Sequence, residues 1–534
     1  MAHTNRISEP KKDKVQETLP ETIMIGAVAV FVFALFALYP LYFQNRYANM
    51  GNAKYDFFKT AYTIFIPVML LSCLCYLFLK RKVLLIKTIF REMVLADWFI
   101  LAYVIACWIS YWLSDYKDTA FWGYDGWFMG VMTQTVFVLL YFFVSRWFLW
   151  HWSYWWFITV PSAIVFLLGI LHRFNVDPLK MYDGLDESIK ILFLSTLGQA
   201  TWYSSYLCIV LPIGMSCYWY RRELKWSALW GIYLCIAFAS VVTQNSDSAF
   251  MALGGSFLVL LWLSFESNEY FMRFWELVVM CLASFKMVGV LQGIFSGRAI
   301  KLEGLSTFCS QSTVTLILLI VAVAVYVGIV FADKKEKMHI EKFCIVRNVL
   351  YALIPVFTIL VIICIYLVST GKVTGTFLNS IGYLNFDQHW GNNRGFTWQF
   401  TARMYSDYGF KEKVFGCGPD AYARMAYAYD TASLQGFWGN SVLACAHNEW
   451  LNCLVDMGIL GLITYLGSFV AAFLVFIKNR KCQPFLVGGA TAIVSYFLHN
   501  FFCYQQIICT PIIFVVMGIG VALIRRKDEY MIQS

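Results

Sequence analysis

Charged residues are scarce in this sequence of 534 residues. Asp, Glu, Lys and Arg make up only 14% of it, whereas 60% of the residues are hydrophobic and the mean hydropathy is +0.63. Soluble globular proteins are typically about half apolar and about a quarter charged. The composition therefore excludes a soluble globular protein, and we find no separate soluble domain. We predict a polytopic membrane protein.

Sequence motifs for metal-dependent or nucleotide-dependent chemistry are also missing. The sequence contains no Asp-x-Asp, HExxH, Walker A or GxSxG pattern, each of which sets ligands or a nucleophile at a fixed spacing. No CxxC or mixed Cys/His spacing occurs, and most of the 16 cysteines lie inside apolar segments, as small hydrophobic residues do. We therefore expect no metal and no cofactor. The net charge of +9 is better explained by membrane topology than by nucleic-acid binding.

The sequence is instead rich in apolar segments of about 17–25 residues, the length that crosses a hydrocarbon core of roughly 30 Å. Many Trp and Tyr residues stand at the segment ends, as they do at membrane–water interfaces. These segments predict an all-α polytopic integral membrane protein with about fourteen transmembrane helices. The predicted helices are 22–43, 59–79, 93–113, 130–147, 154–171, 200–219, 227–243, 248–265, 276–295, 313–332, 349–369, 450–477, 485–503 and 509–524.

Basic residues set the predicted orientation. Clusters such as Lys80-Arg81-Lys82 and Arg525-Arg526-Lys527 fall in alternate connections between the apolar segments, and Lys and Arg concentrate on the cytoplasmic side of membranes. The first apolar segment is too long for a signal peptide, so we expect it to be retained. We predict cytoplasmic tails at 1–21 and 526–534, with a transmembrane domain at 22–525 between them.

The longest outer connection is residues 370–446. Most connections in compact proteins are short, so a segment of this length between two membrane helices is a candidate functional loop. We also expect it to contain strands or helices of its own. Cys309, Cys417 and Cys445 are predicted to lie on the same side. A disulfide between two of these cysteines is left open, because sequence alone does not determine the pairing.

Two arginines of the outer loop are predicted to face different ways. Arg394 and Trp398 are four residues apart, which places them on one face of a helix, whereas Arg403 points to the opposite face. One arginine can therefore face a buried site while the other faces water, and we favour Arg394 for the site. The alternative is that both arginines lie on a solvated surface.

A histidine stands directly before the helix predicted at 450–477. Asn448 is a plausible N-cap, so His447 would sit where the helix N-terminus presents free N–H groups and positive partial charge to an anion. A histidine there can act as a base or donate to a phosphate. Glu449 would face away from it. The alternative is an interfacial histidine that caps a neighbouring carbonyl.

Ionisable residues inside apolar segments are costly and therefore mark candidate sites. Lys286 lies inside one such segment, Asp247 begins another and His499 stands late in a third. Arg298 follows the predicted helix at 276–295. A structural alternative is that Lys286 and Asp247 pair with one another.

Four short blocks follow one another on the predicted outer face. The blocks are Gly123-Tyr124-Asp125-Gly126-Trp127 within 110–130; Ser195-Thr196-Leu197-Gly198-Gln199 leading to Pro212; Arg394-x-x-x-Trp398 leading to Gly416-Cys417-Gly418-Pro419; and Ala446-His447-Asn448-Glu449 followed by Gly458-Ile459-Leu460-Gly461. In this order they resemble the O-antigen ligase family of membrane glycosyltransferases, which also includes O-antigen polymerases and protein O-oligosaccharyltransferases. The resemblance spans about residues 93–525.

The resemblance implies a GT-C-like fold and an enzyme of the bacterial cytoplasmic membrane. Such enzymes transfer a glycan from undecaprenyl pyrophosphate to a hydroxyl or amide acceptor on the outer face, without a nucleotide sugar. It implies that Arg394 contacts the donor pyrophosphate and that His447 lies in the catalytic pocket as the leading candidate for general base. Membrane lipids and the lipid-linked donor are the expected partners. Supporting roles are predicted for Asn448, Trp398, Gln199, Asp247 and His499.

This chain departs from the family at one position. Many relatives carry a Ser-Arg pair where this sequence has Ser246-Asp247, so an acid replaces an anion-binding arginine. Either Lys286 or Arg298 supplies the missing positive charge to the donor pyrophosphate, or the donor phosphate lies differently.

The alternative function is a flippase for polysaccharide or lipid-linked oligosaccharide, because many helices and membrane-embedded charges also suit a transporter. Transporters usually place their polar sites near the bilayer midplane between repeats. Here the polar blocks gather at the outer face, and we find no internal repeat. The sequence therefore favours an enzyme, and it leaves open the sugar, the acceptor and the choice between ligase and polymerase.

Overall fold

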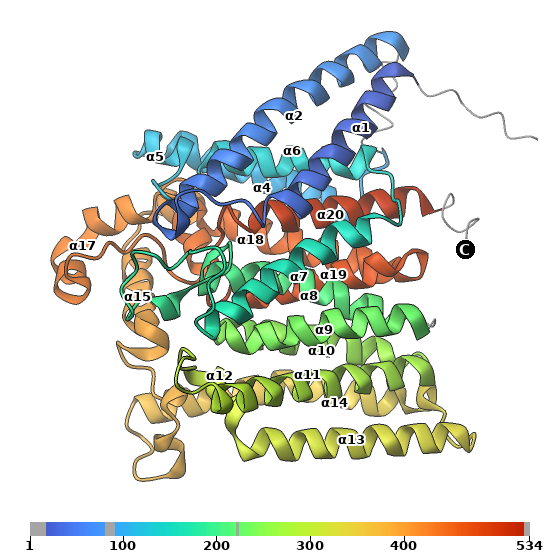
Figure 1. Ribbon diagram of the computed structural model, residues 1–534. Coiled ribbons are helices and arrows are strands. Elements are labelled where there is room, and N and C mark those ends of the chain that lie inside the picture. The colour runs from blue at the N-terminus through green and yellow to red at the C-terminus, as the bar shows by residue number, and fades with distance from the viewer. Residues whose placement is uncertain (1–17, 81–90, 221–223, 528–534) are drawn as a thin grey trace, which may run out of the picture.

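The computed structural model describes residues 18–80, 91–220 and 224–527. In these residues the regular structure is almost entirely helical, and the long helices lie side by side in one bundle (Figure 1). The strands of the described chain are the two-residue β1 (Phe193–Leu194) and β2 (Gly198–Gln199), which pair antiparallel. The prediction of an all-α membrane protein is confirmed.

Each predicted apolar segment coincides with a helix. Nine helices of the described chain are long and apolar enough to span a membrane, and four more are apolar but shorter, so the number of crossings stays a prediction. The helices are α1 (Leu19–Phe33, continued by the π-helical turn Ala34–Leu38), α2 (Met50–Lys80), α4 (Leu95–Leu113), α6 (Val131–Trp147), α7 (Tyr154–Arg173), α8 (Ala200–Tyr220), α9 (Leu224–Thr243), α10 (Ser248–Ser264), α11 (Asn268–Ile294), α13 (Thr313–Lys334), α14 (Cys344–Ser369), α18 (Glu449–Lys478), α19 (Pro484–His499) and α20 (Thr510–Arg525).

The bundle has two distinct ends. The beginning of α1 and the end of α20 lie at one end, on the right in Figure 1, which we call the terminal end. The long segment between α14 and α18 lies at the opposite end, which we call the loop end. Lys334, Lys478 and Arg525 close their helices at the terminal end. Which of the two ends faces the cytoplasm stays a prediction.

The loop segment between α14 and α18 is folded, as predicted. Its helices are α15 (Trp390–Ser406), α16 (Phe410–Phe415) and α17 (Tyr422–Trp438), preceded by the 3-10 turns Phe377–Ser380 and Gly382–Leu384. The segment has its own buried cluster, which includes Phe396, Phe400, Met404, Tyr422 and Leu434, and it reaches Val455 of α18. This apolar core makes the segment a rigid cap on the loop end.

The cap is fastened to α18 at an interruption in that helix. Gly458 has φ 65° and ψ −170°, a conformation that is essentially restricted to glycine. A Cβ at Gly458 would lie 2.3 Å from the carbonyl carbon of Val414, and a Cβ at Gly416 would lie 2.2 Å from the carbonyl oxygen of Asp456. The two backbones therefore approach so closely that neither position accommodates a side chain.

Hydrogen bonds complete this junction. The amides of Cys417 and Gly418 donate to the carbonyl oxygens of Val455 (3.0 Å) and Asp456 (2.8 Å). From α4, the hydroxyl of Ser110 donates to the same Asp456 oxygen at 2.7 Å. Three of the sequence blocks thus meet here for a structural reason.

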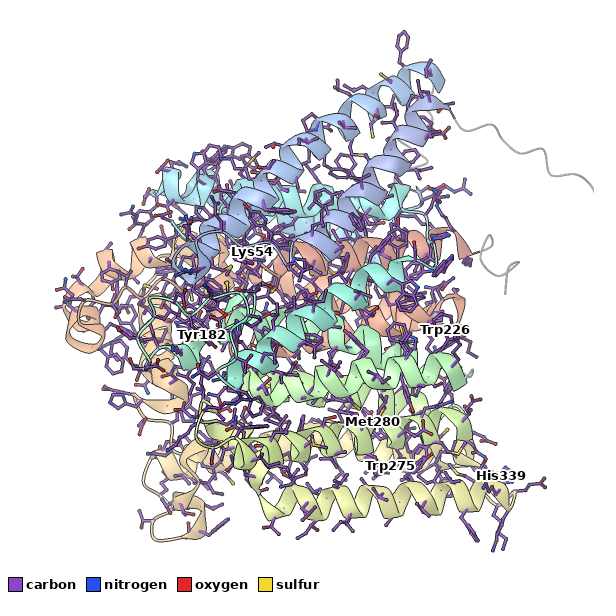
Figure 2. The ribbon with its side chains drawn as sticks, viewed as in Figure 1. Lys54, Tyr182, Trp226, Trp275, Met280 and His339 are labelled. Carbon is purple, nitrogen blue, oxygen red and sulfur yellow. The ribbon has the colours of Figure 1, made fainter. Side chains whose placement is uncertain are left out.

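A second buried polar contact joins the first two helices to each other. Lys54, labelled in Figure 2, is fully buried in α2, and its Nζ donates to the carbonyl oxygens of Tyr39 (2.7 Å) and Pro40 (3.1 Å). These carbonyls follow the π-helical turn, so the lysine adds a hydrogen-bond donor at the end of that helix.

All 16 cysteines are free. Cys417 and Cys445 are buried, and Cys309 is half-buried, so the open alternative of a disulfide among these three is not realised.

Replacing Gly458 by alanine tests the junction. We expect Gly458→Ala to lower the free energy of unfolding by at least about 1–3 kcal/mol, because the residue must leave its glycine conformation, and the new methyl group meets the Val414 carbonyl. The control is Gly436→Ala in α17, where a Cβ meets nothing within 4 Å. Thermal unfolding of the purified full chain in detergent measures both. Equal midpoints for the two variants would contradict this account.

Candidate functional site

Two adjoining cavities at the loop end bring together several of the predicted site residues. The smaller, of about 160 Å³, is lined by Gln199, Thr201, Asn392, Asn393, Arg394, Trp438, His447 and Tyr504. The larger, of about 880 Å³, shares Gln199, Thr201, Asn392 and Arg394 with it and extends to Asp247, Glu303, Tyr383, Trp390 and Phe502. Because four lining residues are common to both, we treat the two as one loop-end cavity.

Arg394 is held at the start of α15 by an irregular turn. Gly391, Asn392 and Asn393 all have positive φ, between 59° and 68°. The Arg394 Nε donates to the carbonyl oxygen of Phe502 (3.0 Å) and Nη1 donates to that of Gly391 (2.6 Å). Within the described residues its Nη2 has no acceptor and no carboxylate pairs with it. The guanidinium therefore keeps N–H groups for an anion.

Arg403 confirms the predicted division of the two arginines. It lies on the same helix but is exposed, and its guanidinium stands 5.9 Å from the ring centre of Phe400. Arg394 is half-buried and lines the cavity. The alternative that both arginines are equally solvated is wrong.

His447 is held in an uncommon backbone conformation. Its φ is 50°, in the left-handed region that non-glycine residues rarely adopt. Flanking bonds fix it there: the Ala446 amide donates to Asn452 Oδ1 at 3.1 Å, and Asn448 caps the next helix. The imidazole packs edge-on against Tyr504, with ring centres 5.3 Å apart. Strained backbone of this kind is common at functional sites.

The imidazole of His447 is neutral at physiological pH. Burial in the cavity wall, and secondarily the positive charge of Arg394, lower the pKa of His447 to about 3. Both side chains line the smaller part of the cavity. An anion bound beside them would raise the pKa of His447 again, because opposite charge favours the protonated form.

The predicted N-cap is confirmed, but the predicted free amides are not. Asn448 accepts hydrogen bonds through its side chain at the start of α18. The prediction that N–H groups remain free for an anion is wrong, because the first four have acceptors inside the protein. Those of Trp450 and Leu451 donate to Asn448 Oδ1, that of Asn452 to the Asn448 carbonyl oxygen, and that of Glu449 to the Asn500 carbonyl oxygen.

Three other predicted residues lie in or beside the cavity. Gln199 lines both of its parts and accepts from the hydroxyl of Tyr504 at 3.3 Å. Asp247 lines the larger part and accepts from the hydroxyl of Tyr383 at 2.6 Å. Trp398 packs behind Arg394, with its ring 5.9 Å from that of Phe502.

Lys286, Arg298 and His499 do not line the cavity. Lys286 donates to the carbonyl oxygen of Ser312 at 3.1 Å, so its alternative pairing with Asp247 is wrong. Arg298 is exposed at the end of α11. His499 is buried within the bundle, where its Nε2 lies 3.0 Å from the Ser204 hydroxyl.

Sequence reasoning missed Arg173, a buried cation beside the cavity. Its Nε donates to the carbonyl oxygen of Thr243 (2.6 Å) and Nη2 to that of Ile191 (3.3 Å), a residue that lines the larger cavity. Its Nη1 is buried without a partner in the described residues. The available signal was an arginine on the predicted outer side, against the positive-inside rule.

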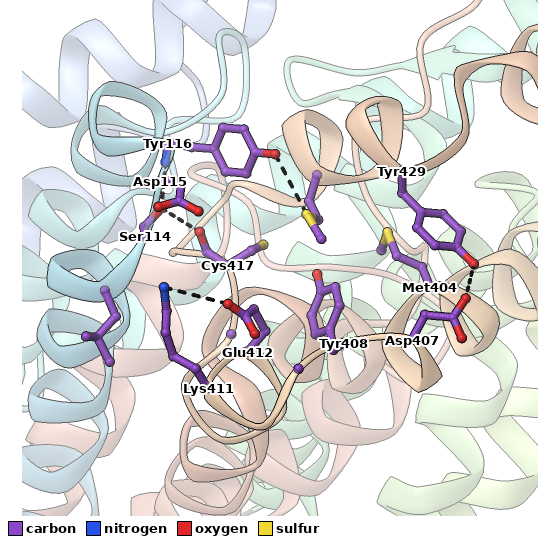
Figure 3. Close-up of a pocket in the computed structure, with 14 residues that line it drawn as sticks. Ser114, Asp115, Tyr116, Met404, Asp407, Tyr408, Lys411, Glu412, Cys417 and Tyr429 are labelled. Atoms are coloured by element: carbon purple, nitrogen blue, oxygen red, sulfur yellow. Dashed lines mark hydrogen bonds and ion pairs between the residues drawn. The ribbon is translucent and has the colours of Figure 1, made fainter.

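A separate pocket of about 200 Å³ lies between residues 114–116 and the cap (Figure 3). Four of its polar side chains pair with one another: Tyr429 donates to Asp407 at 2.6 Å, and Lys411 lies 3.6 Å from Glu412. It contains none of the predicted site residues. The loop-end cavity is therefore the candidate site.

The fold and cavity define a class: a multi-pass helical membrane protein with a cavity under a folded cap that contains an arginine and a histidine. Residues 302–466 match the family model described as O-Antigen ligase. The match includes the cap, Arg394 and His447, and it confirms the predicted family resemblance. The matched region supports assignment to the O-antigen ligase and polymerase family, and with it a function in polysaccharide assembly. Comparison with curated proteins gives no match.

Asp420 makes the stability of the folded protein depend on pH. Its Oδ2 accepts from the amides of Tyr124 (2.7 Å) and Met129 (2.9 Å), yet burial raises the pKa of Asp420 to about 7. An unfolded aspartate titrates near about 3.9. Between those values the folded state binds a proton that the unfolded state lacks, so this residue makes stability fall as pH rises from about 4 to 7.

We therefore expect Asp420→Asn to flatten the pH dependence of stability. The stability of the wild type relative to this variant should decrease across that window, as measured by thermal midpoints of the full chain in detergent. Asp118→Asn removes an exposed carboxylate and controls for the change in net charge. A difference between wild type and Asp420→Asn that is constant with pH would refute the assignment.

Proposed function

We propose that this protein transfers a glycan from an undecaprenyl-pyrophosphate-linked donor to a hydroxyl or amide acceptor at the outer face of a bacterial cytoplasmic membrane. It would act as a ligase or polymerase of cell-surface polysaccharide. The observation that carries the proposal is that Arg394 and His447 line one cavity inside the matched region. Each was selected from sequence for a separate reason.

Arg394 supplies the electrostatic part of the proposed reaction. The acceptor oxygen attacks the anomeric carbon, the bond from that carbon to the pyrophosphate oxygen breaks, and negative charge develops on the departing pyrophosphate. The unpaired N–H groups of Arg394 can bind that charge with charge-assisted hydrogen bonds. Because no carboxylate competes for the guanidinium within the described residues, its full charge is available. We propose that this arginine makes a metal ion unnecessary.

His447 supplies the proton transfer. Its imidazole is neutral before substrate binds, so it has a lone pair to accept the proton of the attacking hydroxyl. A pyrophosphate held by Arg394 raises the basicity of the same imidazole. The proton then passes from His447 to the released pyrophosphate. Donor binding would thus switch the histidine from a weak base to a stronger one.

The larger part of the cavity suits a sugar chain. Its volume of about 880 Å³ lies within the roughly 300–1,000 Å³ of typical ligand sites. Its wall combines Trp390 and Tyr383 with polar groups from Asn245 and Glu303. Aromatic faces and hydrogen-bonding side chains both suit the apolar and hydroxyl surfaces of a sugar.

Separate alanine substitutions test both roles. Arg394→Ala should lower the transfer rate by about 10²–10³-fold, the usual cost of removing one charge-stabilising group, and His447→Ala should lower it by about 10²–10⁴-fold. The assay is transfer from undecaprenyl-pyrophosphate-linked glycan in liposomes. Arg403→Ala, which removes an exposed arginine from the same helix, should leave the rate unchanged.

Normal transfer by both alanine variants would overturn the proposed roles. Movement of the lipid-linked glycan across the liposome without transfer would instead favour the transporter. Donor supplied without a second acceptor distinguishes the two enzyme types: a polymerase lengthens the chain on its lipid, whereas a ligase gives no product.

Cysteine labelling tests the proposed orientation. In an otherwise cysteine-free background, Ser380→Cys in the cap should react with a membrane-impermeant thiol reagent added to intact cells. The matched control is Lys335→Cys, an exposed position just beyond α13 at the terminal end, which should react only after permeabilisation. The reverse pattern would place the cap in the cytoplasm.

A further inference from the structure

Another cavity, of about 560 Å³, is lined by residues of α11, of α12 (Gly304–Gln311) and of the connection between them. These two helices are labelled in Figure 1. The cavity shares no lining residue with the loop-end cavity. Its lining is Lys286, Gly289, Val290, Gln292, Gly293, Ser296, Ala299, Lys301, Leu302, Thr307, Ser310 and Gln311. Two of these residues are cationic and none is acidic.

The two lysines lack an anionic partner. Lys286 is half-buried in α11, and its Nζ donates to the carbonyl oxygen of Ser312 at 3.1 Å. Lys301 is exposed. Throughout residues 18–80, 91–220 and 224–527, neither lysine forms an ion pair. A lysine inside an apolar helix is costly unless it serves a ligand or partner, so the pair points to an anion.

Uncharged donors complete the cavity. Thr307 has a buried hydroxyl without a hydrogen-bond partner among the described residues. Gln292 and Gln311 add amide groups, and the Gln292 Nε2 also donates to the carbonyl oxygen of Ile300 at 3.3 Å. A Cβ at Gly289 would lie 2.2 Å from the carbonyl oxygen of Ser310. This glycine thus lets α12 approach α11 closely enough to bring its hydroxyls to the side of Lys286.

The surroundings of the cavity are apolar and exposed. Val290 lines it and is 54% exposed, and on the same side of α11 Met287 is 59% and Ile294 66% exposed. Phe308 of α12 is 50% exposed. Lys286 lies eight residues from the end of α11, which is about 12 Å along the axis. A ligand here meets cations and a hydrocarbon-compatible face together.

We propose that this cavity binds the phosphate of an anionic lipid. Lys286 and Lys301 bind the phosphate oxygens, Thr307 and the glutamine amides donate to them, and the lipid tail lies along the face of Met287, Val290 and Ile294. Both a phospholipid and a polyprenyl phosphate carry this chemistry. The site stands on its own observations and does not depend on the proposed glycan transfer.

The test measures lipid binding to the full chain in a neutral detergent. Dioleoyl phosphatidylglycerol, undecaprenyl phosphate, dioleoyl phosphatidylcholine and inorganic phosphate are titrated in turn, with native mass spectrometry as the readout. The double variant Lys286→Gln/Lys301→Gln should bind at least one anionic lipid about tenfold or more weakly, since each cation near a lipid phosphate contributes substantially. Phosphatidylcholine should bind alike in both proteins.

Matched variants separate binding from folding. Lys335→Gln/Lys372→Gln removes the same charge from exposed positions elsewhere and should bind like the wild type. Lys301→Gln alone changes an exposed residue without disturbing α11, and it should weaken binding about threefold or more. Weaker binding of only one anionic lipid identifies the source of the phosphate and supports the site.

Two results would overturn the proposal. One is unchanged binding of both anionic lipids by the double variant and by Lys301→Gln. The other is lysine-dependent binding of inorganic phosphate when neither lipid binds, which would make the cavity a site for a free anion.

Discussion

The close backbone contact between residues 416–418 and the interrupted helix α18 is the constraint on which the loop end depends. Because Gly416 and Gly458 have no side chains, the two backbones can approach each other closely. The amides of Cys417 and Gly418 then reach carbonyl oxygens that the break in α18 leaves without helical partners. The cap carries Arg394 on one side of this contact, and the chain leading into α18 carries His447 on the other. The relative position of the two candidate residues therefore follows from a backbone contact outside the cavity.

The electrostatics of the loop-end cavity beside His447 depend on one positive charge, that of Arg394. Arg394 has no carboxylate partner in the described chain. Burial, and secondarily the positive charge of Arg394, lower the pKa of the neighbouring His447 imidazole to about 3. The amides at the start of α18 are all occupied, so they do not share in binding an anion. In the proposed reaction, the departing pyrophosphate would therefore be stabilised mainly by the guanidinium of Arg394. An anion placed there relieves the repulsion and restores the basicity of His447.

The sequence was most informative where burial in lipid dictates composition. Apolar length predicted every long helix because lipid admits few alternatives, and helical spacing alone separated Arg394 from Arg403. Sequence reasoning failed where the hydrogen-bond partner of a residue is distant in sequence. The Glu449 amide donates to the carbonyl oxygen of Asn500, and Lys286 donates to that of Ser312. The buried Arg173 donates to the carbonyl oxygens of Thr243 and Ile191. No local pattern encodes such contacts, because they form only after the helices pack.

The cationic side chains that line the two cavities differ in their surroundings. Arg394 lines a cavity with polar and aromatic walls under the cap, whereas Lys286 and Lys301 line one bordered by exposed apolar side chains. An arginine offers several N–H groups in a fixed plane and binds phosphate directionally, and a lysine acts as a flexible point charge. In the proposed reaction, directional binding suits a pyrophosphate that must leave the anomeric carbon in a fixed direction, and a point charge suits a headgroup that is only retained. The acid Asp247 can then stand in the polar cavity without competing for a lipid phosphate, because the two cavities share no lining residue.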